Sequence, residues 1–444
     1  MSGSIYKAGY MSFGGIQFSA DGEEHTYTLR KSATITGTVV DADTRQSIER
    51  FDVMRGQGTG GDQIYWQTYN MTKGSNGGFS VKLDQQGVTA LRIEADDHLP
   101  AIISLGTNGE RHFDIELKKG SGPKGIVLTP DGQPAAGAQL AVLIRGKMLN
   151  VGAGRLTTYG DSESRTVSAN LDGAFSLRFY ADGDKIIATH PKGYAETAFS
   201  NFVSGSTIKL QPWGTIEGTL KIGARPGTNE SVLLSGEGGL QFNFEDFKAA
   251  TDAQGRFSMA TVPPGERRLV RLIPIGDRSW SHSHAQNVTV KTGEVTTVTM
   301  GGDGRTVIGK LSLSDPSRTI DWGQSGHHML SSHPKPPPFK GMEEYRAWQN
   351  LPETIAAQRE ARYYTMQMRD DGTFQIDDVR AGNYDLQVRL TDGRNGQGFQ
   401  NPIGMLMTNV VVPATPNPAA APPLDLGTLV VPLTRSPQRD AALR

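Results

Sequence analysis

The sequence contains no cysteine, which excludes disulfide scaffolds, thiolate metal sites and cysteine nucleophiles. It has no run of about 18 apolar residues, so no membrane-spanning helix is expected. The first residues, MSGSIYKAGYMSFGG, have neither the basic nor the apolar segment of a secretory signal peptide. The 45 basic and 46 acidic residues nearly balance, which predicts no binding to nucleic acid or to an anionic membrane.

Catalytic motifs are missing as well. The sequence has no GxSxG, no P-loop, no HExxH, and no GxGxxG in a strand–turn–helix setting. A serine, metal or carboxylate active site would have to be assembled from residues that no motif links. We therefore expect that the chain is not an enzyme and that it carries no cofactor.

What the sequence does contain is a repeat. A strand with a central glycine recurs at Gly37, Gly125, Gly218 and Gly309, in steps of 88, 93 and 91 residues. Each copy continues with a Gly-x-Phe hairpin signal, and another glycine follows ten residues after the glycine of that signal. The four phenylalanines, which we expect to fill the space between two sheets, are Phe79, Phe175, Phe257 and Phe374. The stretch PDGQPAAGA at 130–138 is interpreted as a turn of this repeat and not as a ligand site.

A length of about 90 residues with seven short alternating strands predicts a small β-sandwich. The expected fold is all-β, a tandem array of Ig-like or transthyretin-like antiparallel sandwiches. The expected units are closing strands of a truncated repeat (1–30), four sandwiches (31–118, 119–211, 212–302 and 303–435) and a tail (436–444). Short connections favour a monomeric, elongated and semi-rigid array.

The fourth copy carries an insertion at about 315–365. Its proline run, 334–338, favours an extended segment. Residues 342–349 and 353–364 are expected to be helical, with Pro352 in a first-turn position.

The stretches GIVLTPDGQPAAGA, DGAFSL and DGTFQIDDVRAGNYDLQV resemble the carboxypeptidase regulatory-like domains of the transthyretin-like or carbohydrate-binding-like group. The resemblance covers nearly the whole chain. It implies an accessory or stalk module, commonly outside the cytoplasm. The fourth copy is similar to multi-repeat surface or periplasmic proteins of planctomycete and verrucomicrobial type, many of which continue into a thioredoxin-like domain. The zinc ligands of the peptidase itself are not present.

Three functions follow from this resemblance. The first is a non-catalytic extracytoplasmic spacer, scaffold or binding module, with a glycan or a protein as partner. The second is an accessory region of a larger enzyme whose catalytic domain, for example a thioredoxin-like one, lies beyond residue 444. The third is a carbohydrate-binding adhesin.

Aromatic residues provide the candidate ligand site. Strand alternation in QIYWQTYN places Tyr65, Gln67 and Tyr69 on one face. If the opposite face is core, these tyrosines can stack on sugar rings while Gln67 bonds to hydroxyls; the alternative is that both faces are covered. Trp322 and Trp348 of the insertion are further candidates for sugar stacking.

Histidines provide the candidate metal site. His327, His328 and His333 lie close together in the insertion, and imidazoles at such spacing can bind zinc or copper. They have no helical i, i+4 arrangement and no fixed carboxylate partner, so the alternative is a solvated loop. The turn aspartates lack the ligand spacing of an EF-hand, and we expect them to bond to local backbone.

Overall fold

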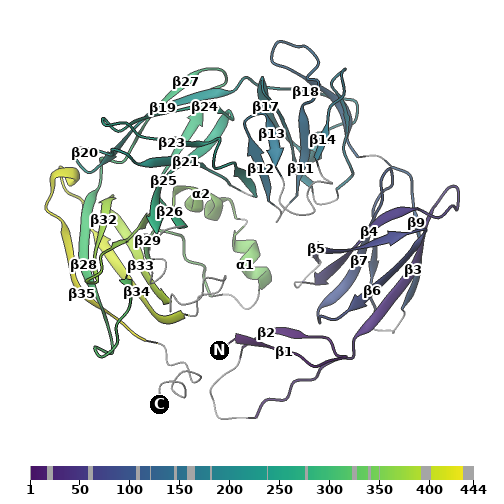
Figure 1. The fold of residues 1–444 in the computed structure, drawn as a ribbon, viewed down its shortest axis with the longest axis horizontal. Helices are drawn as coiled ribbons and strands as arrows, with labels where there is room; N and C mark the ends of the chain where they lie inside the picture. The colour runs from purple at the N-terminus through teal and green to yellow at the C-terminus, as the bar shows by residue number, and fades with distance from the viewer. Residues whose placement is uncertain are drawn as a thin grey trace.

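The computed structural model describes most of the chain. The described ranges are 2–17, 24–58, 64–106, 111–120, 122–144, 148–157, 166–180, 183–237, 239–275, 279–322, 328–338, 342–349, 351–391 and 402–433. In these ranges no helix is long and apolar enough to cross a membrane. Four β-sandwiches follow one another along an open arc, with the first and the fourth at its two ends (Figure 1). The expected all-β class is confirmed.

All four sandwiches share one plan of seven strands in two sheets. In the first sheet, strand 1 pairs antiparallel with strand 4 and parallel with strand 7. In the second sheet the order of the strands is 3-2-5-6. In the first sandwich a single pair, Ser75 with Gly78, joins the two sheets into one of seven strands.

The strands of each sandwich are as follows. Sandwich 1 comprises β3 (Ala33–Asp41), β4 (Arg50–Gly58), β5 (Ile64–Ser75), β6 (Gly78–Leu83), β7 (Val88–Glu94), β8 (Ala101–Ser104) and β9 (His112–Leu117). Sandwich 2 comprises β10 (Lys124–Leu128), β11 (Gln139–Ile144), β12 (Leu149–Gly152), β13 (Arg155–Thr157), β14 (Thr166–Ser168), β15 (Ala174–Ser176), β16 (Gly183–His190), β17 (Gly193–Ala198) and β18 (Thr207–Lys209). Sandwich 3 comprises β19 (Gly214–Ile222), β20 (Arg225–Pro226), β21 (Ser231–Ser235), β22 (Leu240–Phe242), β23 (Lys248–Ala250), β24 (Arg256–Val262), β25 (Gly265–Ile275), β26 (Ser279–Val290) and β27 (Val295–Met300). Sandwich 4 comprises β28 (Arg305–Leu313), β29 (His328–Ser331), β30 (Tyr363–Thr365), β31 (Gln367–Met368), β32 (Thr373–Val379), β33 (Gly382–Thr391), β34 (Pro402–Val412) and β35 (Leu424–Val431).

The phenylalanines of the Gly-x-Phe signals are buried in all four sandwiches, as the sequence predicts. Each lies directly opposite the strand glycine of its own copy. The pairs are Gly37 with Phe79, Gly125 with Phe175, Gly218 with Phe257 and Gly309 with Phe374. The missing glycine side chain leaves room for the ring, so the two sequence signals of the repeat form one packing unit.

The N-terminal strands β1 (Ser2–Ile5) and β2 (Phe13–Gln17) form an antiparallel hairpin. Ile5 pairs with Phe13, as Ile93 pairs with Ala101 in the β7–β8 hairpin 88 residues later. The bridge between Tyr10 and Lys31 is likewise repeated between His98 and Lys119. This hairpin therefore copies strands 5 and 6 of a sandwich.

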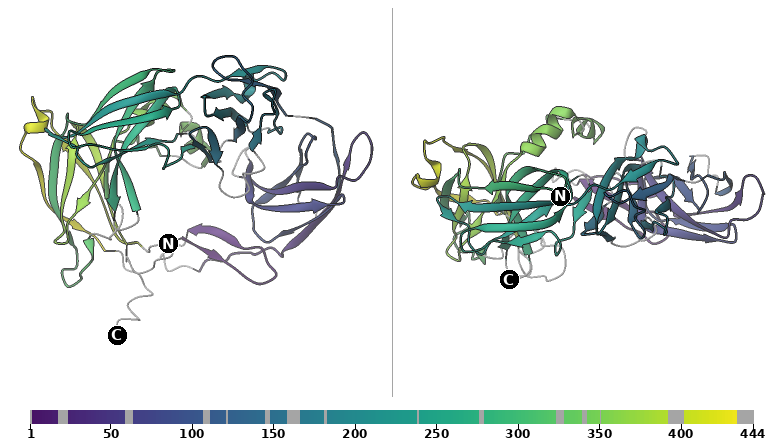
Figure 2. Two further views of the ribbon diagram at one scale, coloured as in Figure 1. Left: turned by 45° about the horizontal axis from the view of Figure 1, so that its top comes forward. Right: turned by 90° about the horizontal axis from the view of Figure 1, so that it is seen from above.

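The insertion in sandwich 4 contains the two helices α1 (Met342–Gln349) and α2 (Pro352–Glu360). They rise out of the plane of the arc (Figure 2). The second helix ends at Glu360, four residues before the predicted end. Tyr363–Thr365 instead forms β30, because Tyr364 is buried in the core of sandwich 4 and its strand pairs with β29.

Candidate functional site: the junctions between sandwiches

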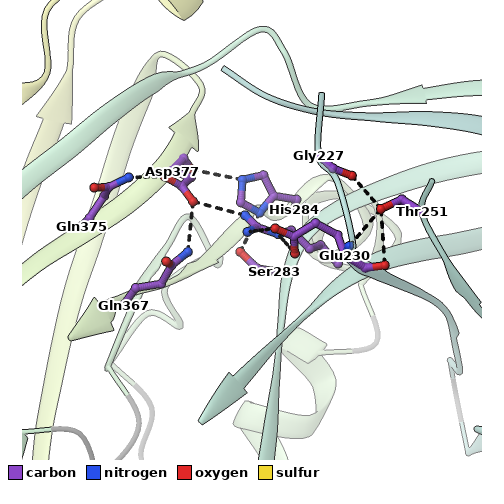
Figure 3. A network of polar contacts seen from close by, with 9 residues as sticks. Gly227, Glu230, Thr251, Ser283, His284, Gln367, Gln375 and Asp377 are labelled. Atoms are coloured by element: carbon purple, nitrogen blue, oxygen red, sulfur yellow. Dashed lines mark hydrogen bonds and ion pairs between the residues drawn. The ribbon is translucent and has the colours of Figure 1, made fainter. Parts of the chain in front are cut away.

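The most developed polar cluster in the described chain lies between sandwiches 3 and 4. Arg271 of β25 in one sandwich pairs with Asp377 of β32 in the other. Figure 3 shows the residues around this pair, among them Glu230, His284 and Asp377. The guanidinium of Arg271 makes a bidentate contact with Glu230, with Nε and Nη2 at 2.9 and 2.8 Å from the two carboxylate oxygens. Its Nη1 lies 3.4 Å from Asp377 Oδ2. The side chains of Arg271 and Asp377 are only 5% and 4% exposed.

The Asp377 carboxylate has further donors. Gln367 Nε2 donates to it at 3.0 Å, and Gln375 donates to its other oxygen. Burial by itself would raise the pKa of Asp377, but the hydrogen bond from Gln375 and the Arg271 charge outweigh it and lower that pKa. Asp377 is therefore ionised at neutral pH, and the Glu230–Arg271–Asp377 group holds one cation between two anions.

His284 of β26 completes the contact between the sandwiches. Its Nε2 lies 3.0 Å from the Asp377 carbonyl oxygen, and its Nδ1 lies 2.8 Å from Ser283 Oγ. Because a carbonyl only accepts, Nε2 carries the proton and Nδ1 accepts from the serine hydroxyl. Burial, with Arg271 nearby, lowers the pKa of His284 to about 3, so the ring is neutral at pH 7.

The serine and histidine resemble part of a catalytic triad, but their surroundings do not fit catalysis. The histidine is oriented by a backbone carbonyl and not by a carboxylate. Ser283 is fully buried, and its oxygen also accepts the Thr365 backbone N–H. The adjoining cavity of about 20 Å³ has room for about one water molecule. A histidine with a pKa of about 3 is a poor general base at neutral pH.

The segment joining the two sandwiches is also fixed. Asp378 accepts hydrogen bonds from the backbone N–H groups of Gly302 and Gly304, at 2.5 and 2.7 Å. Asp378 has a φ of +52°, at a register shift between β28 and β32. Thr261 has a φ of +56° at the equivalent shift in sandwich 3. The unusual backbone of Asp378 thus points its carboxylate at the linker.

Sandwiches 2 and 3 are joined differently, by a shared sheet. Strands β12 and β13 of sandwich 2 form a hairpin, and β12 pairs in parallel with β22 of sandwich 3. One cluster of buried apolar side chains runs through both sandwiches and includes Val151, Tyr194 and Phe247. Apolar burial therefore stabilises this junction.

A polar cleft of about 650 Å³ lies beside this shared sheet. Across it Arg267 donates to Glu196 at 2.7 Å, and Lys185 donates to the same carboxylate at 2.9 Å. Burial would raise the pKa of Glu196, but these two cations lower it, so the group is ionised. Arg359 of α2 also lines the cleft and pairs with Glu237 at 3.0 Å, which ties the insertion of sandwich 4 to sandwich 3.

The predicted sugar site falls in β5. The side chains of Tyr65 and Tyr69 lie outside the described residues. Gln67 is 2% exposed, and its Nε2 donates to Gln85 Oε1 at 3.2 Å. Its amide therefore lies inside sandwich 1 and not on an open face.

The two tryptophans of the insertion lie apart in the fold. Trp322 is half-buried against the core of sandwich 4, next to Gly372. Trp348 is half-buried on α1, with its ring centroid 5.8 Å from that of Tyr345.

The predicted histidine site is divided between a buried and an exposed position. His328 is buried in β29, and His333 stacks on Tyr363 with 6.2 Å between ring centroids. Burial and the nearby Arg268 lower the pKa of His333. His327 lies outside the described residues. Within the described ranges, no three histidine, aspartate or glutamate side chains are grouped so as to hold a metal ion.

Sequence reasoning did not find the junction network. The SWSHSH stretch contains His282 and His284 but carries no motif that marks either of them as part of a site. Its partner Asp377 lies 93 residues later, in a stretch that the sequence marks only as a repeated hairpin. The fourth copy alone has a DD pair starting three residues after the phenylalanine of the Gly-x-Phe signal, and this pair is the one local sign of the network.

No family model matches the chain, and no curated protein matches it either. Among solved structures, the chain is similar to a streptococcal ancillary pilin, with 12% identity, a TM-score of 0.21 and coverage of 61% of this chain and 98% of the pilin. A minor pilin of Streptococcus agalactiae has 14% identity and a TM-score of 0.20, covering 40% and 94%. The Bacillus anthracis TIE protein has 10% identity and a TM-score of 0.18, covering 94% and 76%. TM-scores this low establish neither a common fold nor a common function, so the β-sandwich class rests on the strand pairings of this chain.

Proposed function

We propose that this chain is a non-catalytic scaffold, a curved array of β-sandwiches that holds its attached or bound partners at a fixed spacing. The observation that carries the proposal is the buried Glu230–Arg271–Asp377 group between sandwiches 3 and 4. Buried ions are stabilising only when their geometry is well satisfied, so this group favours one orientation of the two sandwiches. The shared sheet does the same for sandwiches 2 and 3.

The resemblance to carboxypeptidase regulatory-like repeats supports a finer version of this proposal. In that version the array is extracytoplasmic and serves as a spacer on its own or as an accessory region of a larger enzyme. Both roles need a defined shape and no reactive group in the array itself. The burial of Ser283 and His284 agrees with this requirement.

Small-angle X-ray scattering tests the scaffold. We expect the scattering of the chain to match the arc, and an Arg271→Ala, Asp377→Ala double variant to give a broader distribution of particle dimensions. A Glu294→Ala variant, which removes one partner of an exposed pair with Lys291, is the control. Unchanged scattering in the double variant, or hydrolysis of ester, peptide or glycoside substrates that is lost in Ser283→Ala, would overturn the proposal.

The cleft between sandwiches 2 and 3 favours a second function, the binding of a carbohydrate. Carboxylate, ammonium and amide groups line it, among them those of Asp184, Lys209 and Gln211, and such groups bond to sugar hydroxyls. A glycan array with the intact chain tests this function. A Lys209→Ala variant assigns binding to the cleft, whereas a Tyr65→Ala, Tyr69→Ala variant assigns it to β5. The absence of binding on the array argues against both sites.

A further inference from the structure

Strand β34 presents an apolar edge at the end of the array. It runs over eleven residues, PIGMLMTNVVV, without a charged side chain. Met405, Met407 and Val411 are 53%, 60% and 66% exposed. Most edge strands carry a charge, a proline or a bulge that prevents pairing with other chains. From Leu406 to Val412 this strand has none of these.

The backbone of this edge is open as well. Met405 N–H points away from β33, because it donates to Pro432 O at 3.2 Å. Residues alternate in direction along a strand, so the N–H and C=O groups of Met407, Asn409 and Val411 also point away from β33. In the part of the chain that the structure describes, β34 pairs with β33 and otherwise only through the bridge of Gly404 with Leu433.

Neighbouring sandwiches cover the equivalent strand in sandwiches 2 and 3. Strand 6 of sandwich 3 is β26, whose His282 carbonyl and Ser283 hydroxyl accept from Thr365 of sandwich 4. Strand 6 of sandwich 2 is β17, whose Glu196 binds Arg267 of sandwich 3. In both junctions the neighbour is another β-sandwich, so a β-sandwich is the kind of partner that this strand position fits.

We propose that β34 pairs antiparallel with β34 of a second copy of the chain about a two-fold axis at Asn409. This register places Met407 opposite Val411 of the other copy and brings all three outward backbone positions into hydrogen-bonded pairs. The strand has no charge, so like charges do not meet across the axis. The two four-stranded sheets become one sheet of eight strands, and two arcs are joined end to end.

Sedimentation velocity on the intact chain tests the interface. We expect a concentration-dependent dimer whose dissociation constant rises at least tenfold in a Met407→Lys variant, because a charged ammonium group then replaces the apolar side chain that lies opposite Val411 of the other copy. Ile102→Lys is the matched control, since Ile102 is also an exposed apolar residue, 51% exposed, on the edge strand β8. A monomer at all concentrations, or an equal effect of both substitutions, would overturn the proposal.

A crosslink tests the register independently. The natural chain has no cysteine, so Asn409→Cys introduces a unique thiol. Two residues facing each other in a hydrogen-bonded antiparallel pair have Cα atoms about 5.5 Å apart, within the range of a disulfide. We expect mild oxidation to give a covalent dimer at least tenfold faster than in an Ile102→Cys variant. Equal rates would show that β34 does not form the interface, whichever state sedimentation reports.

Discussion

Gly218 lies directly opposite Phe257 in the antiparallel β19–β24 pair, and the aromatic ring covers the glycine. A Cβ atom at Gly218 would lie 2.2 Å from the ring carbon Cζ. At Gly309 the corresponding distance to Phe374 is 2.6 Å. Both distances are far below van der Waals contact, so the glycine of the repeat is required by packing.

The first prediction concerns this pair. Gly218→Ala is expected to lower the free energy of unfolding by about 1–3 kcal/mol, the usual cost of overpacking. Phe257→Leu in the same chain is expected to recover part of the loss, because the smaller side chain makes room for the methyl group. Gly78→Ala is the control, since a Cβ there meets only Ser75 O at 3.7 Å. Urea unfolding measures all three; equal losses at Gly218 and Gly78 would contradict the packing argument.

The second prediction concerns the ions at the junction of sandwiches 3 and 4. Asp377→Ala is expected to cost about 1–3 kcal/mol, because Arg271 keeps its pair with Glu230 while Gln367 and Arg271 Nη1 lose their acceptor. Glu294→Ala, in an exposed pair with Lys291, is expected to cost less than about 1 kcal/mol. Chemical denaturation compares the two variants. Similar losses would mean that the buried group contributes no more than a surface pair.

The third prediction concerns pH. The pKa of His284 is lowered from 6.5 to about 3 by burial, so below pH 6.5 the unfolded chain binds a proton that the folded chain excludes. Stability is therefore complete above pH 6.5 and falls as the pH drops toward 3, by up to about 1.4 kcal/mol per pH unit from this one group.

Stability curves at pH 6.5, 5.8 and 5.0 measure this slope. We expect His284→Gln to reduce this slope more than His282→Gln does. Desolvation lowers the pKa of His282 as well, but His282 is exposed whereas His284 is buried. Carboxylates whose pKa is lowered in the folded chain, such as Asp377, stabilise the fold down to a lower pH, so their loss does not contribute to the slope between pH 6.5 and 5.0. An unchanged slope in His284→Gln would rule out this linkage.

The fourth prediction concerns the junction of sandwiches 1 and 2. In the described residues, no buried apolar cluster spans these two sandwiches, and their ion pair between Arg178 and Asp96 is largely exposed. We expect calorimetry to give one transition for sandwich 1 and a separate one for sandwiches 2–4. Limited proteolysis between Lys118 and Lys124 is expected to release the larger unit intact. A single transition for the whole chain would show that this junction is also rigid.

Much of the fold follows from local patterns. The spacing of Gly37, Gly125, Gly218 and Gly309 predicts four sandwiches because each copy repeats the same strand and turn signals. Pro352 predicts the start of α2, because proline fits the first turn of a helix. The end of α2 could not be predicted in this way, because Tyr364 enters the core of sandwich 4 as part of β30.

The candidate site follows from tertiary structure much more than from local pattern. Gln67 alternates with Trp66 along β5, yet its amide is buried against Gln85. His284 and Asp377 meet only because β26 and β32 belong to adjacent sandwiches. Each stretch read by itself is an ordinary strand, and neither identifies its partner.

The sequence by itself determined the repeating unit, its turns and one buried phenylalanine per copy, because period-2 alternation and turn chemistry act over a few residues. Only the tertiary structure decided how the units join, through the β12–β22 sheet and the Arg271–Asp377 contact. These junctions join residues about 90 to 106 positions apart. Which side chains are buried at these junctions depends on how whole sandwiches pack against each other, and no local sequence pattern predicts it.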